Sequence, residues 1–332
     1  MNIVSIKENS GLPKYKQIVS SIENAITSGL LKKGDKLPSI NNIKNKHALS
    51  RDTVLSAFNV LKTRGIIQSI VGKGYYVTSE NIDVEKKVFL LFDELNAFKD
   101  DLYNSFLSNL DKNIKIDIFF HHFNFDVFNK LISDNIGNYN YYVIMPANLK
   151  NTDLVINKLP ADKVYILDQT HKELSQYPAI YQNFKKNIKE GLTNCLNLIK
   201  NYSKLILVFP EKKQPQGMLK GFKAFCKENN INNEVIPTIK GKELEYDCAY
   251  VVPDDRILIR ILKKSKEENM ILAKDFGIIS YNDTILKEFV EGGITTISTD
   301  FYKMGEQLAQ MIMNNENKKI INPNKVIIRN SI

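Results

Sequence analysis

The chain has 332 residues, of which 43% are hydrophobic and 25% are charged, and its formal net charge is +9 at pH 7. This length predicts two or three domains, and the hydrophobic content is enough to bury a core in each. The charge is uneven, because residues 1–80 hold 12 Lys and Arg against 5 Asp and Glu, a net of +7. A small basic domain on a near-neutral body is typical of nucleic-acid binding.

Cysteine spacing and hydropathy argue against several other classes of protein. Cys195, Cys226 and Cys248 show no CxxC or Cys/His spacing, which predicts buried free thiols in a reducing compartment rather than disulfides or zinc. The adjacent His121 and His122 would point to opposite faces of a strand, so we expect no metal site, and no cofactor motif is present. With no leader peptide and no apolar run of about 18 residues, we expect a soluble, cytoplasmic protein without membrane contact.

The first 78 residues show helix and turn signals in close succession. Apolar residues recur at helical spacing over 15–28, and Gly29 follows where a helix would end. A short helix is expected around 39–45 with Ser39 as its N-cap, and a third over 51–64 with Ser50 as its N-cap. The free N–H groups that begin this third helix lie beside Arg51, as in a recognition helix that enters the major groove. Residues 66–78 predict a hairpin whose turn is Gly72-Lys73-Gly74.

These motifs resemble the winged-helix domain of GntR-type regulators. The resemblance is carried by Gly34-Asp35-Lys36-Leu37-Pro38-Ser39, Ser50-Arg51-Asp52-Thr53-Val54, Leu61-Lys62-Thr63-Arg64-Gly65-Ile66-Ile67 and Gly72-Lys73-Gly74-Tyr75-Tyr76-Val77. It implies that Ser39, Arg51, Thr53 and the wing glycines contact DNA. The expected DNA-binding residues are Ser39, Asn41, Ser50, Arg51, Asp52, Thr53, Gly72, Lys73 and Gly74. Many relatives carry arginine where this chain has Asn41, and often where it has Leu55, so we expect it to read a different DNA sequence.

The pattern changes after a polar stretch over 79–87, which we expect to be a linker. Short apolar segments then alternate with amphipathic ones, first near 88–92, 114–120, 142–145 and 164–167, and again near 205–209, 234–237, 249–252 and 276–279. This alternation predicts parallel sheets flanked by helices, with ligands bound outside the carboxyl ends of the strands. Two such lobes would enclose a cleft that can close on a small molecule.

The body resembles LacI-type regulators and periplasmic sugar-binding proteins. Its resemblance rests on Val252-Pro253-Asp254-Asp255, on 275–283, on Thr295-Thr296-Ile297 and on 304–309. The expected fold class is therefore α/β, with a winged helix-turn-helix over 1–78 and a two-lobed, periplasmic-binding-protein-like domain over 88–332. We expect lobe 1 to comprise about 88–180 and 300–328, and lobe 2 about 184–298.

The cleft between the lobes is the expected effector site. The expected effector-binding residues are Asp93, Glu94, His121, Asp168, Asp254, Asn282 and Phe301. The last four match effector positions of the resembled family, and their carboxylate, amide and aromatic groups suit a sugar. The first three are candidates only because they end strands, and any of the seven could instead cap a turn or helix. Met218 stands where relatives often place an arginine that grips sugar hydroxyls.

The two halves together predict a transcription regulator that responds to a ligand. By analogy with both families we expect a repressor that binds a palindromic operator as a homodimer and releases it when a small sugar-like effector binds. One alternative is a ligand-independent DNA-binding protein with a vestigial sensor. The other is an α/β enzyme fused to a DNA-binding head, although the sequence has no phosphate loop, no G-x-G-x-x-G after a strand and no G-x-S-x-G.

Overall fold

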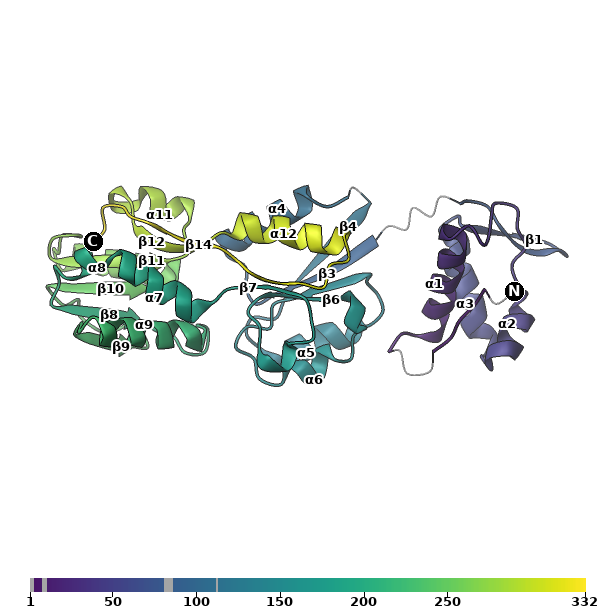
Figure 1. Cartoon of the computed structure of the whole chain (residues 1–332), viewed down its shortest axis with the longest axis horizontal. Coiled ribbons are helices and arrows are strands. Elements are labelled where there is room, and N and C mark those ends of the chain that lie inside the picture. Colours follow the sequence, from purple (N-terminus) through teal and green to yellow (C-terminus); the bar gives the residue numbers. More distant parts are fainter. Residues whose placement is uncertain (1–2, 8–10, 81–85, 112) are drawn as a thin grey trace.

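The computed structural model describes residues 3–7, 11–80, 86–111 and 113–332. Figure 1 shows three bodies along the long axis, namely a helical head that carries the N-terminus and two α/β lobes. The C-terminus lies in the lobe farther from the head. Within the ranges given above, none of the helices combines the length and the apolar character needed to cross a bilayer.

The head consists of three helices followed by a two-stranded hairpin. Its elements are α1 (Lys14–Thr27), α2 (Ile40–His47), α3 (Arg51–Thr63), β1 (Ile67–Ile70) and β2 (Gly74–Val77). The apolar face of α3 packs against α1, with Val54, Phe58 and Leu61 fully buried. The two strands pair antiparallel, with Ile70 opposite Gly74. This hairpin therefore extends from the helices as a wing (Figure 1).

Lobe 1 is built on a six-stranded parallel sheet in the order β13-β7-β6-β5-β3-β4. Its strands are β3 (Lys86–Phe92), β4 (Ile114–Phe120), β5 (Tyr141–Ile144), β6 (Val164–Asp168), β7 (Ala179–Tyr181) and β13 (Lys319–Ile321). Its helices are α4 (Ala97–Ser108), α5 (Phe125–Asp134), α6 (Thr152–Ile156) and α12 (Phe301–Met313), with short 3-10 turns at Ala161–Lys163 and Lys172–Leu174. Alternate residues of β3 enter two cores, Leu90 with α4 and α12, and Leu91 with α5. The strand is therefore apolar throughout, because helices cover both faces of the sheet.

Lobe 2 repeats this plan in the order β14-β12-β11-β10-β8-β9, with β14 antiparallel and the other neighbours parallel. Its strands are β8 (Lys204–Val208), β9 (Asn233–Ile236), β10 (Cys248–Val252), β11 (Phe276–Tyr281), β12 (Thr295–Thr299) and β14 (Asn324–Ile327). Its helices are α7 (Phe184–Asn194), α8 (Leu196–Ile199), α9 (Gln216–Glu228), α10 (Asp255–Glu267) and α11 (Ile285–Phe289), with a 3-10 turn at Val290–Gly292. The three cysteines are buried and free, as their spacing predicts.

The chain passes between the lobes three times, at residues 181–184, 299–301 and 321–324. The third crossing overturns one expectation, because lobe 1 does not extend to about 328. Asn324 pairs with Thr299, so Asn324–Ile327 forms the edge of the lobe 2 sheet beside β12. The sequence of so short a strand would suit the edge of either sheet. Its pairing partner alone determines the lobe to which it belongs.

The predicted linker over 79–87 is described in part, since residues 81–85 lie outside the described residues. The strand β3 begins inside the predicted range, at Lys86, which pairs with Ile114. Lys86 and Lys87 are exposed at the start of this strand. Hydropathy therefore gives no signal for the first two residues of β3.

Candidate functional sites

The exposed N-terminus of α3 is built by a side-chain cap. Ser50 Oγ accepts a hydrogen bond from the backbone N–H of Thr53 at 3.1 Å and lies 2.7 Å from Thr53 Oγ1. Arg51 and Asp52 follow in the first turn and are both exposed. Within the described part of the chain, Arg51 forms no ion pair with Asp52 or Asp35. Its guanidinium and the positive end of the helix dipole are therefore both available to an anionic partner.

The preceding helix is capped in the same manner. Ser39 Oγ accepts from the backbone N–H of Asn42 at 3.1 Å, and Asn41 is exposed in the first turn. The left-handed conformation of Ala48, at φ 51°, ends α2 and reverses the chain toward Ser50. The starts of α2 and α3 therefore belong to one helix-turn-helix unit.

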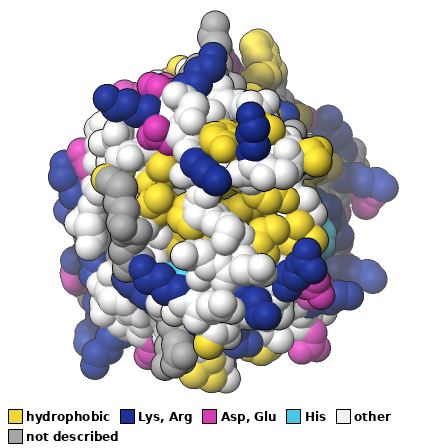
Figure 2. Space-filling model, turned by 90° about the vertical axis from the view of Figure 1, so that its right-hand side faces the viewer, with side chains coloured by type: hydrophobic (Ala, Val, Ile, Leu, Met, Phe, Trp, Pro, Cys, Tyr) yellow, Lys and Arg dark blue, Asp and Glu magenta, His cyan; other side chains and the backbone are white. Residues whose placement is uncertain are grey.

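The wing ends in a turn that depends on glycine. Gly72 and Gly74 have φ values of +74° and +113°, in the region that favours glycine, and Lys73 is exposed between them. Val71, beside this turn, is 97% exposed. Seen from the head end, Lys and Arg side chains surround an apolar area with few acidic groups near its centre (Figure 2). Such a basic rim suits the phosphate backbone of a nucleic acid.

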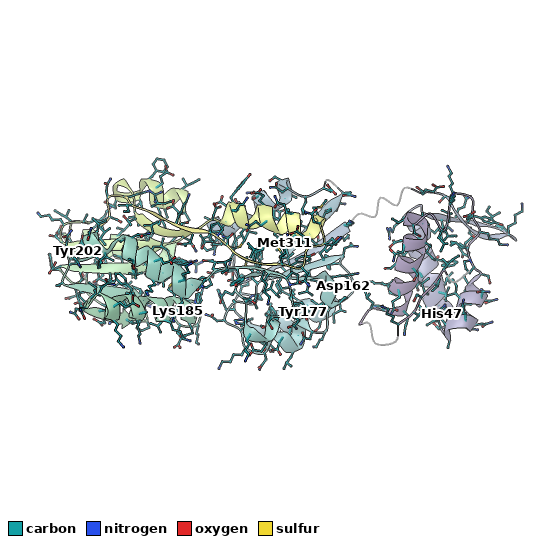
Figure 3. All side chains as sticks on the ribbon, in the orientation of Figure 1. His47, Asp162, Tyr177, Lys185, Tyr202 and Met311 are labelled. Carbon is teal, nitrogen blue, oxygen red and sulfur yellow. The ribbon has the colours of Figure 1, made fainter. Side chains whose placement is uncertain are left out.

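A cavity of about 290 Å³ lies between the two lobes, at the carboxyl ends of their strands. Its lining includes Asp93, Glu94, Phe98, Lys99, Asp168 and Phe301 from lobe 1, and Met218, Asp254, Tyr281 and Asn282 from lobe 2. A more open hollow of about 1340 Å³ adjoins it and shares Phe123 and Lys213 with it. Lys185, which also lines the outer hollow, lies near the boundary between the lobes (Figure 3). The inner cavity has the position and size of a small-molecule site.

A buried polar network joins the lobes at the back of this cavity. Gln182 lies in the first crossing, and its Nε2 donates to Asp168 Oδ1 at 2.6 Å. Its Oε1 accepts from the hydroxyls of Tyr281, at 3.3 Å, and of Thr299. Burial raises the pKa of the Asp168 carboxyl, while nearby Lys99 and the bond from Gln182 oppose that rise. Asp168 also has a left-handed φ of +68°, a strained conformation of the kind that clusters at functional sites.

Lys99 is a buried cation in the same wall. It forms an ion pair with Asp93 Oδ1, and both side chains are almost completely buried. Burial lowers the pKa of Lys99 to about 7, and the nearby carboxylate of Asp168 opposes that shift. Removing two charges from water costs free energy that their attraction often fails to recover. The Lys99–Asp93 pair is therefore weak evidence for a role in stability alone.

Asp254 and Asn282 line the cavity from lobe 2. Asp254 is the N-cap of α10, because its Oδ1 accepts from the backbone N–H of Ile257 at 2.9 Å. Asn282 is 7% exposed, and its Oδ1 has no hydrogen-bond partner within the described residues. Lys287 donates to the backbone carbonyl of Asn282 at 2.5 Å and fixes this strand end. Asp254 thus combines a capping role with a place in the cavity wall, and Asn282 presents an unused acceptor.

Phe98, in the first turn of α4, and Phe301, the first residue of α12, form part of the aromatic wall of the cavity. Their rings are stacked with centroids 4.5 Å apart. Phe301 is 5% exposed and therefore presents one edge or face to the cavity rather than to bulk water.

Three contacts join the lobes at the mouth of the cleft. Lys213 Nζ of lobe 2 lies 2.6 Å from Glu94 Oε2 of lobe 1. The same ammonium lies 5.2 Å from the ring centroid of Phe123. Asn148 Nδ2 donates to the backbone carbonyl of Gln214 at 2.5 Å. These contacts hold the lobes together on one side of the cavity.

Six of the seven expected effector residues line the inner cavity, and His121 does not. The His121 side chain is fully buried, and its Nε2 lies 3.0 Å from the carbonyl oxygen of Met145. Burial lowers the pKa of His121 to about 4, so the ring is neutral at pH 7. Ending a strand places a residue near the cleft but does not decide which way its side chain points.

Sequence reasoning missed Lys99, Gln182, Tyr281 and Lys213. Gln182 and Lys213 lie in connecting segments without apolar periodicity, and Lys99 looks like an ordinary wet-face residue of an amphipathic helix. Tyr281 ends β11 directly before Asn282, and this position was a signal that it could line the cavity.

The sequence comparisons place the head in a known family. The model described as "Bacterial regulatory proteins, gntR family" matches residues 14–77. The chain is 32% identical over 96 residues to the HTH-type transcriptional repressor YtrA of Bacillus subtilis, covering 28% of this chain and 73% of that protein. The chain belongs to the GntR family. It is also 37% identical over 82 residues to the mannosyl-D-glycerate transport/metabolism system repressor MngR of Escherichia coli, covering 25% of this chain but only 34% of that protein.

The body of this GntR-family chain matches a different model. The "Periplasmic binding protein-like domain" matches residues 199–332. A ribose-bound LacI family regulator from Enterococcus faecium superposes with a TM-score of 0.60 at 16% identity, covering 74% of this chain and 98% of that chain. The trehalose repressor of Escherichia coli gives 0.62 at 14% identity, covering 73% and 100%. At these identities the likeness establishes the LacI-type fold of the body, and the whole is a DNA-binding transcription regulator.

Proposed function

We propose that this GntR-family regulator is a cytoplasmic homodimeric repressor whose hold on a palindromic operator is controlled by a small carbohydrate-like effector in the interlobe cavity. The observation that carries the proposal is the polar wall of that cavity, where Gln182 connects Asp168 of lobe 1 to Tyr281 of lobe 2. A ligand bound there contacts both lobes and therefore favours one degree of closure. Ribose and trehalose appear in the names of two structurally similar regulators, which supports a sugar as the ligand class.

The DNA-binding surface in this proposal is the start of α2, the start of α3 and the wing. It comprises Ser39, Asn41, Ser50, Arg51, Asp52, Thr53, Gly72, Lys73 and Gly74. Arg51 reads a base edge in the major groove, and Lys73 approaches phosphate or the minor groove. A dimer matches two half-sites of a palindrome through its own twofold symmetry.

The signal from cavity to head passes through lobe 1. Lys16 of α1 donates hydrogen bonds to the Gly137 carbonyl and to Asn138 Oδ1, in the turn that follows α5. Partial burial lowers the pKa of Lys16 at this contact, with Lys163 contributing. Because a head is held against lobe 1, a change of closure shifts the spacing between the two heads of the dimer and releases the operator.

The test begins with duplexes selected from a random library by the full chain, followed by a monosaccharide thermal-shift screen. A sugar that binds the folded state raises the melting temperature by mass action. Asp254→Asn keeps the capping oxygen but removes the charge, so we expect intact DNA binding and a weakened sugar response. Asp126→Asn changes an exposed carboxylate outside the cavity and serves as the matched control.

Two outcomes oppose the proposal. A flat screen together with normal operator binding favours a ligand-independent DNA-binding protein. Tighter operator binding in the presence of the sugar reverses the expected sign and indicates a co-repressor.

A further inference from the structure

The inner cavity holds more negative than positive groups. Its described lining includes five carboxylates and three cations, namely Asp93, Glu94, Asp168, Asp254 and Asp255 against Lys99, Lys213 and Arg256. Two of the cations are already paired, Lys99 with Asp93 and Lys213 with Glu94. Arg256 is exposed at the rim. Lys99 and Lys213 are therefore neutralised by carboxylates of the protein, and Arg256 lies at the surface.

Asp168 is the carboxylate without a direct ion pair, because Lys99, the nearby cation, is paired with Asp93. Asp255 pairs with Lys287 at 2.9 Å, and Asp254 accepts the capping bond of α10. Asp168, by contrast, forms no ion pair among the described residues, and its side chain receives one hydrogen bond, from Gln182. Burying a carboxylate that must share a nearby cation with a second carboxylate is costly. A cation that arrives with the ligand would offset this cost.

A second acceptor faces the same cavity independently of this charge balance. Asn282 is 7% exposed, lines the cavity and has an unpartnered Oδ1. Two nearby donors already bond to protein groups, since Gln182 Nε2 donates to Asp168 and the Tyr281 hydroxyl donates to Gln182. The Asn282 Oδ1 and the Asp168 carboxylate are therefore left as acceptors on this part of the wall. The matching ligand edge must therefore carry donors, and a protonated amine offers three donors and no acceptor.

The rest of the wall suits a cation as well. The rings of Phe98, Phe123, Phe184 and Phe301 line the cavity. Aromatic faces attract cations through their quadrupole and also pack against the C–H surface of a sugar ring. Met218, which is 2% exposed, adds an apolar group without a competing positive charge.

We propose that the effector of this cavity carries a protonated amino group, as in an amino sugar, with the ammonium bound by the Asp168 carboxylate and the Asn282 side-chain oxygen. This inference rests on the proposed function, since it names the ligand class of the same cavity.

The test compares matched sugars on the full chain by isothermal titration calorimetry at pH 7. The probes are D-glucosamine, D-galactosamine and D-mannosamine, each with its neutral parent hexose and its N-acetyl derivative. We expect at least one amine to bind on the order of tenfold to a hundredfold more tightly than both of its neutral partners, the range expected for one charged hydrogen bond. Asp168→Asn keeps an acceptor for Gln182 and should remove this preference. Asp126→Asn, outside the cavity, should retain it.

Each result decides a different point. A neutral hexose that binds as tightly as its amine overturns the amine inference and leaves a carbohydrate effector in place. Absence of binding by all nine sugars overturns the amino-sugar inference, and the monosaccharide screen described above then decides whether the effector is a carbohydrate. The wild-type protein alone shows whether free amines bind more tightly than their acetylated forms. Misfolding of Asp168→Asn would therefore not prevent a test of the amine inference. If a folded Asp168→Asn protein still prefers the amine over its neutral partners, the ammonium does not bind to Asp168 and the assignment is wrong.

Discussion

Replacing Arg51 by alanine should separate operator affinity from folding stability. Arg51 is exposed, and within the described residues it forms no ion pair, so its loss should change the free energy of unfolding by no more than about 0.5 kcal/mol. A bidentate contact to a base is worth about 1 to 3 kcal/mol. We therefore expect operator binding to weaken roughly 5- to 150-fold, with relaxed preference at one base position.

Arg64 provides a matched control at the other end of the same helix. Its guanidinium pairs with Glu23 of α1 at 2.5 Å, with the two side chains 31% and 16% exposed. Arg64→Ala should therefore lower stability by up to about 1 kcal/mol and leave operator affinity unchanged. Fluorescence anisotropy at fixed salt reports affinity, and urea denaturation reports stability. The reasoning is refuted if Arg51→Ala binds the selected operator as wild type does, or if it loses stability to the same extent as Arg64→Ala.

Three further predictions test other parts of the molecule. Lys73→Ala should reduce the slope of log affinity against log salt by about 0.9, as expected for one lost phosphate contact, and an unchanged slope would remove the wing from the interface. Gly221→Ala should destabilise the body by about 1 to 3 kcal/mol in urea denaturation, because the added Cβ would overlap Ile188 of α7. The lowered pKa of His121, about 4 against 6.5 when unfolded, means that its protonation favours unfolding, so stability should fall as pH drops from 6.5 toward 4. Between pH 6.5 and 5 wild type should lose up to about 2 kcal/mol more than a folded His121→Gln protein, whereas His122→Gln, an exposed neighbour, should behave as wild type.

Local signals were sufficient to predict the head. Ser39 and Ser50 are caps because their side chains can reach a free N–H three residues on, and this geometry depends only on neighbouring residues. The same holds for the wing turn, where Gly72 and Gly74 adopt positive φ values. The alternation of strands and helices in the body was also readable, because strands covered on both faces are continuous apolar runs.

Long-range pairing set the limit of sequence reasoning in the body. Asn324–Ile327 joins lobe 2 only because its partner is β12, which no local pattern encodes. His121 and Asp168 both lie at strand ends, yet one is buried beside Met145 and the other lines the cavity. The central position of Gln182 depends on its contacts with Asp168, Tyr281 and Thr299, which are distant in sequence and meet only in the folded chain.

The control of DNA binding by the interlobe cavity can be measured directly. A preformed complex of the full chain with its selected, fluorescently labelled operator is titrated with the sugar that gives the largest rise in melting temperature. We expect the anisotropy to fall to the value of free DNA at sugar concentrations near its dissociation constant, and Asp254→Asn to require a higher concentration. Operator affinity that stays unchanged while the cavity is saturated with sugar would contradict control of this regulator through its cleft.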